Sequence, residues 1–396
     1  MHKETNPFTF GDLALDDAFT DREDELRELV SDMLNGQNVL VYAPRRYGKS
    51  SLVLRASQEA LRARALVGYC DLMRTPTKER LAAALAKTIY ADIASLVDQV
   101  FERAVDLFRS LRITPTMEID PSDGSLRFSF EAGRRKADID DTIERLLELL
   151  GELAAQRKRR VVMIFDEFQE VLALDPRFPN LMRAVFQAQP EVSHVYLGSK
   201  RHLLERIFSD RNEPFWRSAK QLEIGMIAQE KFSIFIDTRF AETGKRITRE
   251  ALERLLQATG GHPYGTQELA YFVWELTPES GEAAVAVVDG ALTNVLRSEH
   301  NHFTQLWDEA PHQQRLLMLA IAAEPTASVY AKAYHERHEL PANPTLQTAL
   351  NALRKKEIVG RNRQGEYCII EPFFAHWLLR DQGETGLPSR LGRPEA

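Results

Sequence analysis

The stretch from Asn38 to Leu54, NVLVYAPRRYGKSSLVL, constrains the fold of this chain more than any other. A short apolar, β-prone run comes first, a turn with proline and glycine follows, and helical spacing then continues to Arg64. In such a turn the backbone N–H groups of residues 46–50 can point inward around a phosphate, beside the positive end of the new helix. The stretch therefore predicts a buried strand, a phosphate-binding loop and a helix in direct succession.

The residues of this loop have expected roles. The match is to the loose form A-x-x-x-x-G-K-S, because Ala43 stands where the full pattern has glycine. We expect Lys49 to bring its charge to the β- and γ-phosphates and Ser50 to give its hydroxyl to Mg²⁺. The residues expected to bind the nucleotide here are Ala43, Pro44, Arg45, Arg46, Tyr47, Gly48, Lys49, Ser50 and Ser51. An ordinary strand-to-helix turn is the weaker interpretation, because a strand and a helix flank the motif directly.

Length and composition limit the alternatives. A chain of 396 residues predicts two or three domains, and a net charge of -7 argues against a protein coated with nucleic-acid-binding surface, although a local basic patch stays open. Cys70 and Cys368 are too few and too far apart for a disulfide framework or a zinc site. The first residues carry no apolar signal core, and no apolar run reaches membrane-spanning length. We expect a cytoplasmic protein with no membrane partner.

A second polar site is predicted where another strand ends. The apolar run Val161 to Phe165 leads directly into Asp166 and Glu167. Two carboxylates at the end of a buried strand are unfavourable unless they have partners or a task. We expect Asp166 to hold the water shell of Mg²⁺ and Glu167 to polarise an attacking water molecule.

Two further side chains are candidates for the same site. Ser199 follows the strand His194 to Gly198; it can bond the γ-phosphate or the attacking water, or it can cap the helix that begins at Arg201. Arg217 is a candidate sensor of the γ-phosphate, and the alternative is an ordinary surface arginine. With Lys49, Asp166 and Glu167, these residues form the expected catalytic set.

Three other segments leave alternatives open. Before the loop, a helix is expected that Thr20 or Asp21 caps; Phe19 and Arg22 either approach the base of the nucleotide or belong to a helix that only covers a sheet edge. The basic run 157–160 predicts either a nucleic-acid patch or a solvated helix end. A helix-breaking turn further on could lay His262 and Pro263 against a nucleotide.

The expected domain order follows from where the strand signal stops. We expect a P-loop core over 1–225 with a hairpin insertion near 112–132, a helical lid over 226–298, a winged helix over 299–382 and a disordered tail over 383–396. Three helices followed by a β-hairpin are typical of a winged helix. Its third helix and wing carry a locally basic face of Arg354, Lys355, Lys356, Arg361 and Arg363, partly offset by Glu357 and Glu366.

Five segments together resemble a known family. In order and spacing, APRRYGKSSL, VVMIFDEFQEV, LGSK, TGGHPYGTQ and EPFFAHWL resemble the archaeal-type P-loop ATPases of the STAND/AAA-like signal-transduction branch, relatives of the origin-recognition ATPases. The resemblance covers residues 6–379. It implies an α/β fold whose parallel sheet of five strands has one strand between those of the Walker A and Walker B motifs, followed by a helical lid and a C-terminal winged helix.

The resemblance also implies site residues and a function. It places residues 19–23 near adenine and residues 261–263 in the lid, from which they close over the nucleotide. Residues 213–217 follow the family's Pro-Leu-Tyr-Gly-Arg segment only loosely, which leaves the role of Arg217 open. We expect a slow, Mg²⁺-dependent ATPase that acts as a switch and passes its nucleotide state to an unknown protein partner. The alternative is an ATP-regulated DNA-binding protein. A protein that binds ATP without hydrolysis is disfavoured by Glu167.

Overall fold

The chain folds into two compact units. The computed structural model describes residues 5–11, 19–94, 114–119, 126–131, 136–362 and 364–382. The sheet unit comprises Arg22–Arg45 and Lys49–Ile224, and the helical unit comprises Met1–Asp21, Arg46–Gly48 and Gly225–Ala396. Each unit has its own apolar core.

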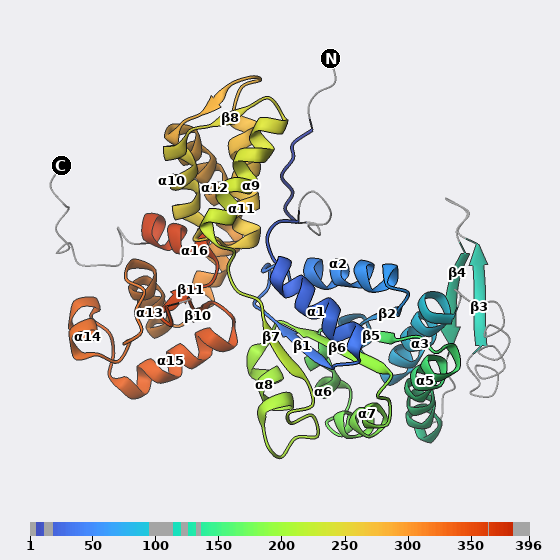
Figure 1. The fold of residues 1–396 in the computed structure, drawn as a ribbon. Helices are drawn as coiled ribbons and strands as arrows, with labels where there is room; N and C mark the ends of the chain where they lie inside the picture. Colours follow the sequence, from blue (N-terminus) through green and yellow to red (C-terminus); the bar gives the residue numbers. More distant parts are fainter. Residues whose placement is uncertain are drawn as a thin grey trace. The chain divides into compact units, whose positions relative to one another are not determined.

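The sheet unit alternates strands and helices (Figure 1). Its strands are β1 (Val39–Tyr42), β2 (Leu66–Asp71), β3 (Thr114–Ile119), β4 (Leu126–Glu131), β5 (Val161–Asp166), β6 (Val192–Gly198) and β7 (Lys220–Glu223). Its α-helices are α1 (Glu23–Asn35), α2 (Lys49–Arg62), α3 (Lys78–Thr88), α5 (Lys136–Arg157), α6 (Val171–Leu174), α7 (Phe178–Gln187) and α8 (Arg201–Ser209).

Five of the strands form one parallel sheet in the order β2-β5-β6-β1-β7. Strand β1 precedes the phosphate loop, β5 ends in Asp166, and β6 lies between them, as the predicted fold class requires. Helices α1 and α2 cover one face of the sheet, and α3 and α5 cover the other (Figure 1). Because both faces are covered, the first five residues of β5 are all buried, and they form the continuous apolar run seen in the sequence.

A separate hairpin interrupts this pattern between α3 and α5. Strands β3 and β4 pair antiparallel, with Thr114 opposite Glu131 and Ile119 opposite Leu126. The pair lies where the hairpin insertion was expected, and residues 120–125 between the two strands lie outside the described residues.

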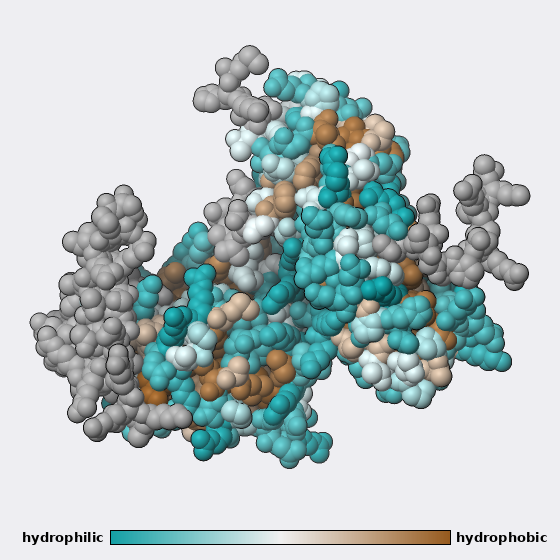
Figure 2. Space-filling model, turned by 180° about the vertical axis from the view of Figure 1, so that it is seen from behind, coloured by the Kyte–Doolittle hydropathy of each residue, from teal (hydrophilic) through white to brown (hydrophobic). Residues whose placement is uncertain are grey.

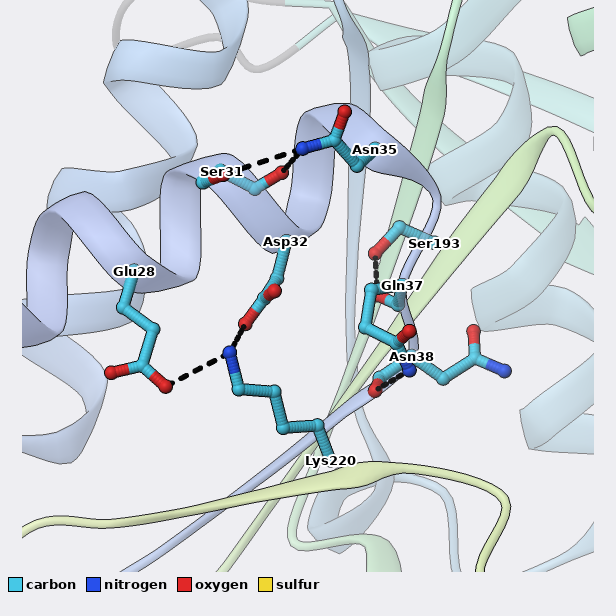
Figure 3. Close-up of polar contacts among 8 residues, drawn as sticks. All are labelled: Glu28, Ser31, Asp32, Asn35, Gln37, Asn38, Ser193 and Lys220. Atoms are coloured by element: carbon cyan, nitrogen blue, oxygen red, sulfur yellow. Dashed lines mark hydrogen bonds and ion pairs between the residues drawn. The ribbon is translucent and has the colours of Figure 1, made fainter.

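Where its strands begin, the sheet carries polar side chains that stabilise the fold (Figure 3). We call this end, which includes Asn38, Arg160, Ser193 and Lys220, the amino edge. Lys220 Nζ lies 2.9 Å from Glu28 Oε1 and 2.8 Å from Asp32 Oδ2 of α1, and Ser193 Oγ donates to the carbonyl of Gln37 at 2.7 Å. His194 is buried behind them, with Nδ1 3.1 Å from Asn38 Oδ1.

Arginines of the basic run 157–160 also take part in this packing. Arg160 donates through Nε to the carbonyl of Leu34 at 3.1 Å and through Nη1 to that of Pro190 at 2.8 Å. Arg159 donates to the carbonyls of Arg64 and Ala65. These two side chains therefore join main-chain segments of the sheet unit. This structural task differs from both expected alternatives, a solvated helix end and a nucleic-acid patch.

The start of α1 differs from the expected one. Arg22 precedes the helix with φ 73°, and no side chain caps the first turn, so the expected cap by Thr20 or Asp21 is wrong. Three acidic residues, Glu23 to Glu25, occupy the first turn, where negative charge is favourable.

The helical unit contains a helical part and a winged helix. Its α-helices are α9 (Gln229–Glu242), α10 (Arg249–Thr259), α11 (Pro263–Leu276), α12 (Val285–Asp308), α13 (His312–Ala323), α14 (Lys332–His338), α15 (Asn343–Lys355) and α16 (Pro372–Trp377). Its strands are β8 (Arg246–Ile247), β9 (Glu282–Ala283), β10 (Val359–Arg361) and β11 (Tyr367–Ile369). The short parallel pair of β8 and β9 was not expected. Helices α13, α14 and α15 are followed by the antiparallel pair β10–β11, which confirms the winged helix.

The face drawn in Figure 2 is mainly hydrophilic, with apolar patches between the hydrophilic side chains. Among the described residues, the exposed large apolar side chains are Leu61, Met73, Trp216, Ile234, Leu276, Val285, Tyr330 and Leu379. Isolated apolar residues of this kind are ordinary on soluble folds. Among the described residues, no helix has the length and apolar character needed to cross a membrane.

Candidate functional site

The parallel strands end together and bring the candidate residues to one edge of the sheet. Tyr42 at the end of β1 is in register with Gly198 at the end of β6, and Asp71 of β2 is in register with Asp166 of β5. We call this end the carboxyl edge. Ligands of open α/β sheets bind at such edges, beyond the ends of the strands.

The backbone of the phosphate loop is shaped for an anion. Between Tyr42 and Lys49, where α2 begins, Arg46 and Gly48 adopt left-handed conformations with φ 66° and 80°. A side chain at Gly48 would have room, so glycine is favoured there by the backbone conformation. Residues that alternate between right- and left-handed conformations turn successive N–H groups into one concavity, and the helix end adds its partial positive charge. The loop therefore fits a phosphate.

Side chains of the loop differ in their surroundings. Ala43, Lys49 and Ser51 are buried in the sheet unit, Pro44 and Ser50 are half-buried, and Arg45 is exposed. Lys49 is 7% exposed and is the first residue of α2, directly after Gly48 of the concavity. A buried cation at a helix N-terminus is unfavourable without an anion, so its position agrees with phosphate binding.

The tip of the loop belongs to the helical unit. The guanidinium of Arg46 lies 4.4 Å from the centroid of the Tyr264 ring, and its Nη1 is 3.3 Å from Glu371 Oε2. Tyr47 is buried, with its ring centroid 5.0 Å from that of His262 in an edge-to-face contact. These contacts hold the side chains at the tip, while the N–H groups of the loop are the part that fits a phosphate.

Asp166 accepts a hydrogen bond on each of its two carboxylate oxygens. The backbone N–H of Glu167 donates to Oδ1 at 2.9 Å, and the hydroxyl of Tyr69, on the neighbouring strand β2, donates to Oδ2. Burial, the hydrogen bond with Asp166 and nearby carboxylates raise the pKa of Tyr69 far above its usual value, so the hydroxyl keeps its proton. The orientation of this carboxylate is therefore set by β2 as well as by β5.

Glu167 is held by two neighbours. Its own backbone is left-handed, with φ 51°. The amide nitrogen of Gln169 donates to Glu167 Oε2, and the hydroxyl of Ser199 lies 3.2 Å from the same oxygen. Gln169 and Ser199 are both buried, at 1% and 2% exposure. The expected alternative in which Ser199 caps α8 is wrong, because Lys200 occupies the cap position and no side chain caps that helix.

The close packing beneath Glu167 depends on Gly198. A Cβ atom at this position would overlap the amide oxygen of Gln169 and would lie 2.8 Å from a methyl carbon of Leu204. The absence of a side chain on β6 therefore makes the space that Gln169 occupies. The amide oxygen of Gln169 has no hydrogen-bond partner there, so the polar contact of this side chain is the one with Glu167.

The residues at this edge fit a magnesium ion that is shared with a nucleotide. Mg²⁺ in such sites is held by one or two protein oxygens, phosphate oxygens and water. Asp166 at the end of β5 and Ser50 in the first turn of α2 offer a carboxylate and a hydroxyl of this kind. In the part of the chain that the structure describes, there is no group of three or more His, Cys, Asp or Glu side chains that could hold a metal ion. A magnesium ion here would therefore need phosphate oxygens and water as its other ligands.

Candidates from the sheet unit outside these clusters have local partners. Arg22 is 5% exposed, and its Nη1 lies 3.0 Å from Glu25 Oε1. Arg217 is exposed in the segment between α8 and β7, with a left-handed backbone and its guanidinium 5.1 Å from the centroid of the Trp216 ring. Their expected contacts with base and γ-phosphate stay predictions.

Candidates from the helical unit have structural surroundings. His262 is 1% exposed and caps α11, because its Nδ1 accepts a hydrogen bond from the N–H of Gly265 at 3.0 Å. Burial lowers the pKa of His262 to about 3, so its imidazole is neutral. Pro263 is the first residue of α11, where proline is favoured. Phe19 is half-buried, and for all three residues contact with a nucleotide stays a prediction.

Sequence reasoning missed Tyr69 and Gln169 as members of the site. Gln169 lies in the segment FDEFQ, so its distance from Glu167 along the chain could have drawn attention to it. Tyr69 gives no such signal, because its contact with Asp166 depends on the pairing of two strands that are far apart in the sequence.

Comparisons with known proteins identify the family. A model described as an ATPase domain predominantly from Archaea matches residues 19–269, which is more than half of the chain. The chain belongs to this ATPase family. A model described as a probable winged helix domain matches residues 301–380. As a member of the family, the protein is a P-loop ATPase that binds ATP, as the resemblance implied.

Several solved structures are similar to this ATPase, and the first of those below agrees with its fold. A Walker-type ATPase of Pyrococcus abyssi is 18% identical, covers 92% of this chain and 97% of its own, and superposes with a TM-score of 0.60. The Aeropyrum pernix ORC1 protein in complex with DNA is 16% identical, with coverage of 93% and 94% and a TM-score of 0.46. The RuvB Holliday junction branch migration motor of Thermotoga maritima is 13% identical, with coverage of 92% and 96% and a TM-score of 0.41. A search of curated proteins found no match.

Proposed function

We propose that this ATPase is a slow, Mg²⁺-dependent molecular switch whose nucleotide state is passed through the helical unit to a protein partner. The observation that carries the proposal is the pair of hydrogen bonds that Gln169 and Ser199 donate to Glu167. Both hydrogen bonds meet on Oε2 and hold the carboxylate in one orientation. Rotation of Glu167 toward an attacking water would break them, which favours slow turnover. We keep the cytoplasmic location as a prediction.

The roles of the residues follow from their positions. The N–H groups of the phosphate loop and the ammonium of Lys49 bind the phosphates and reduce their charge. Glu167 orients the attacking water and accepts its proton, and Ser199 keeps the carboxylate near the end of β6. Ser50 and Asp166 would hold Mg²⁺, which supplies charge stabilisation at the phosphates when it is bound. We place Phe19, Arg22, Arg217, His262 and Pro263 as candidate nucleotide contacts that the closed form would use.

A comparison of two nucleotide states tests the switch. Turnover is expected below about 1 s⁻¹, the lower end of the usual range for enzymes. Hydrogen exchange of α10 to α16 is expected to differ between Glu167→Gln with bound ATP and the unaltered protein with bound ADP, because a switch must change the helical unit. Identical exchange in the two states, with both nucleotides shown to be bound, would contradict the switch and leave only an ATPase.

A second candidate function, ATP-regulated DNA binding, is favoured by one face of the winged helix. Asn343, Gln347 and Asn351 are exposed and four residues apart on α15, and Arg354 and Lys355 extend the same helix. Asn and Gln side chains can form two hydrogen bonds with adenine, and the basic side chains can contact phosphates. The helix therefore carries groups for both kinds of DNA contact.

The wing contributes less to this candidate than the sequence suggested. The guanidinium of Arg361 lies 4.2 Å from the centroid of the Tyr367 ring, and its Nη2 donates to the Tyr367 hydroxyl at 2.8 Å. Arg363 lies outside the described residues. The DNA-binding candidate thus rests on α15, and the acidic chain as a whole favours the switch.

Replacing Arg354, Lys355 and Lys356 together by alanine separates the two candidates. A DNA-binding protein is expected to lose affinity for duplex DNA, with a salt dependence shallower by about 0.9 in log-log slope for each phosphate that the variant no longer binds. A switch that acts on a protein partner is expected to bind random duplex DNA no tighter than about 10⁻⁴ to 10⁻⁶ M in either form. The measurement is fluorescence anisotropy over a series of salt concentrations, with ATP present.

A further inference from the structure

Strand β2 brings an unassigned tyrosine to the candidate magnesium ligand. Tyr69 is in register with Ile164, two residues before Asp166, so the side chains of Tyr69 and Asp166 lie on the same face of the sheet. The hydroxyl of Tyr69 reaches Asp166 Oδ2, while the N–H of Glu167 is bonded to Oδ1. Rotation of the carboxylate away from this position would break both hydrogen bonds.

The neighbouring acid on β2 has a different task. Asp71 is the register partner of Asp166, yet its Oδ1 accepts a hydrogen bond from the N–H of Met73 at 3.0 Å, and its Oδ2 pairs with Arg74 at 3.0 Å. Asp71 therefore caps the short turn that follows β2. Tyr69 is the β2 side chain that contacts Asp166 by a hydrogen bond.

We propose that Tyr69 is a positioning residue that orients the carboxylate of Asp166 for Mg²⁺. This inference rests on the proposed magnesium-dependent ATPase activity. Magnesium requires nearly ideal octahedral geometry, so a carboxylate that turns freely is a poorer ligand than one held by its neighbours. Partners of metal ligands in other proteins change metal affinity or activity by about 10- to 100-fold when they are removed.

The variant Tyr69→Phe removes the hydroxyl and keeps the ring. ATP affinity is measured by calorimetry with excess Mg²⁺ and with EDTA, which gives the magnesium-dependent gain in affinity as a ratio. The gain is expected to fall by about 10-fold in Tyr69→Phe, while the affinity in EDTA stays unchanged. In hydrolysis assays the Mg²⁺ concentration for half-maximal rate is expected to rise by the same factor, with little change in the rate at saturating Mg²⁺.

Tyr42 offers a matched control in the same sheet. Its hydroxyl also donates to a carboxylate, Glu223 Oε2, at 2.9 Å, and burial and that carboxylate raise its pKa to about 12. Tyr42→Phe therefore removes a comparable hydrogen bond without touching Asp166. We expect Tyr42→Phe to keep the full magnesium-dependent gain.

Three outcomes would overturn the inference. An unchanged gain in Tyr69→Phe would make Tyr69 a purely structural residue. Equal losses in Tyr69→Phe and Tyr42→Phe would indicate a general loosening of the sheet, and circular dichroism with thermal unfolding would record it. An unaltered protein that binds ATP equally well with and without Mg²⁺ would remove the premise, but its binding in EDTA would still support the nucleotide site. The magnesium-dependent gain therefore tests the role of Tyr69, whereas binding of ATP in EDTA separately tests the nucleotide site.

Discussion

The two edges of the same sheet are both polar, but their polar groups have different relations to the fold. At the amino edge, Lys220 bonds to α1 and Ser193 to the main chain next to β1 (Figure 3). Arg160 joins two main-chain carbonyls at the same edge. At the carboxyl edge, Asp166 accepts a hydrogen bond from the N–H of Glu167, and Glu167 accepts one from Gln169. The phosphate loop, whose N–H groups form a concavity, follows a strand that ends at the same edge. Charge at a strand end therefore does not by itself indicate function; what matters is whether it contacts the scaffold alone or also borders an anion site.

The largest expected effect contrasts the two lysines at these edges. Lys49→Ala is expected to weaken ATP binding by roughly 10²-fold, because one charge-assisted hydrogen bond to phosphate contributes up to about 3 kcal/mol. Lys220→Ala removes a partly exposed ion-pair cluster, so it is expected to cost at most about 1 kcal/mol of stability and to leave ATP affinity unchanged. Calorimetry with ATP measures both variants. Similar affinities for Lys49→Ala and the unaltered protein would remove the phosphate-site assignment.

The next effect contrasts the acids of the two edges. Glu167→Gln is expected to retain ATP binding but to slow hydrolysis by at least ~10²-fold, because the base that accepts the proton from water is absent. Asp32→Asn, at the amino edge, alters the partner of Lys220 and is expected to hydrolyse ATP at the normal rate. Single-turnover hydrolysis with labelled ATP measures the chemical step. Normal turnover in Glu167→Gln would mean that another group activates the water.

The last contrast concerns pH and stability at the amino edge. His194 is fully buried, its ring stacks on Phe186 at 3.8 Å between centroids, and burial lowers its pKa to about 3. Between pH 6.5 and about 3 the unfolded chain therefore binds a proton that the folded chain does not, so the free energy of unfolding falls as the pH is lowered through this range. Above pH 6.5 this effect is absent.

Hydrogen exchange of the β6 amides, followed as the pH is lowered, measures that fall as a free energy of opening. The variant His194→Gln carries no titrating ring, so its opening free energy is expected to depend less steeply on pH over the same range. Equal slopes in the two proteins would show that the acid sensitivity of the sheet arises from other groups.

The sequence predicted the elements of the fold better than the contacts of the site. Strands β1, β2 and β5 are buried on both faces, so each is an apolar run with clear ends. The strand between those of the Walker A and Walker B motifs came from the resemblance to a family, whereas the winged helix was predicted from three helices followed by a hairpin. The phosphate loop and the pair Asp166–Glu167 were predicted because their chemistry depends on residues adjacent in the chain.

Contacts between distant segments were beyond the sequence. The hydrogen bond from Tyr69 to Asp166 depends on the register of β2 and β5, and the choice of Ser199 between a helix cap and Glu167 depends on how β6 ends. The start of α1 was predicted wrongly: Arg22, which has a left-handed backbone, occupies the N-cap position, and no side chain caps the helix. Local propensity decides neither register nor backbone strain.

The packing of Gln169 beneath Gly198 has a consequence for how this protein can vary. A methyl group at position 198 and a glutamine at position 169 compete for the same volume, so a substitution at one position is tolerated only with a smaller or displaced side chain at the other. The two positions are therefore expected to change together over evolutionary time. Because Gln169 also bonds to Glu167, a substitution of Gly198 on β6 would displace Gln169 and thereby change the rate of hydrolysis, although residue 198 itself contacts no nucleotide.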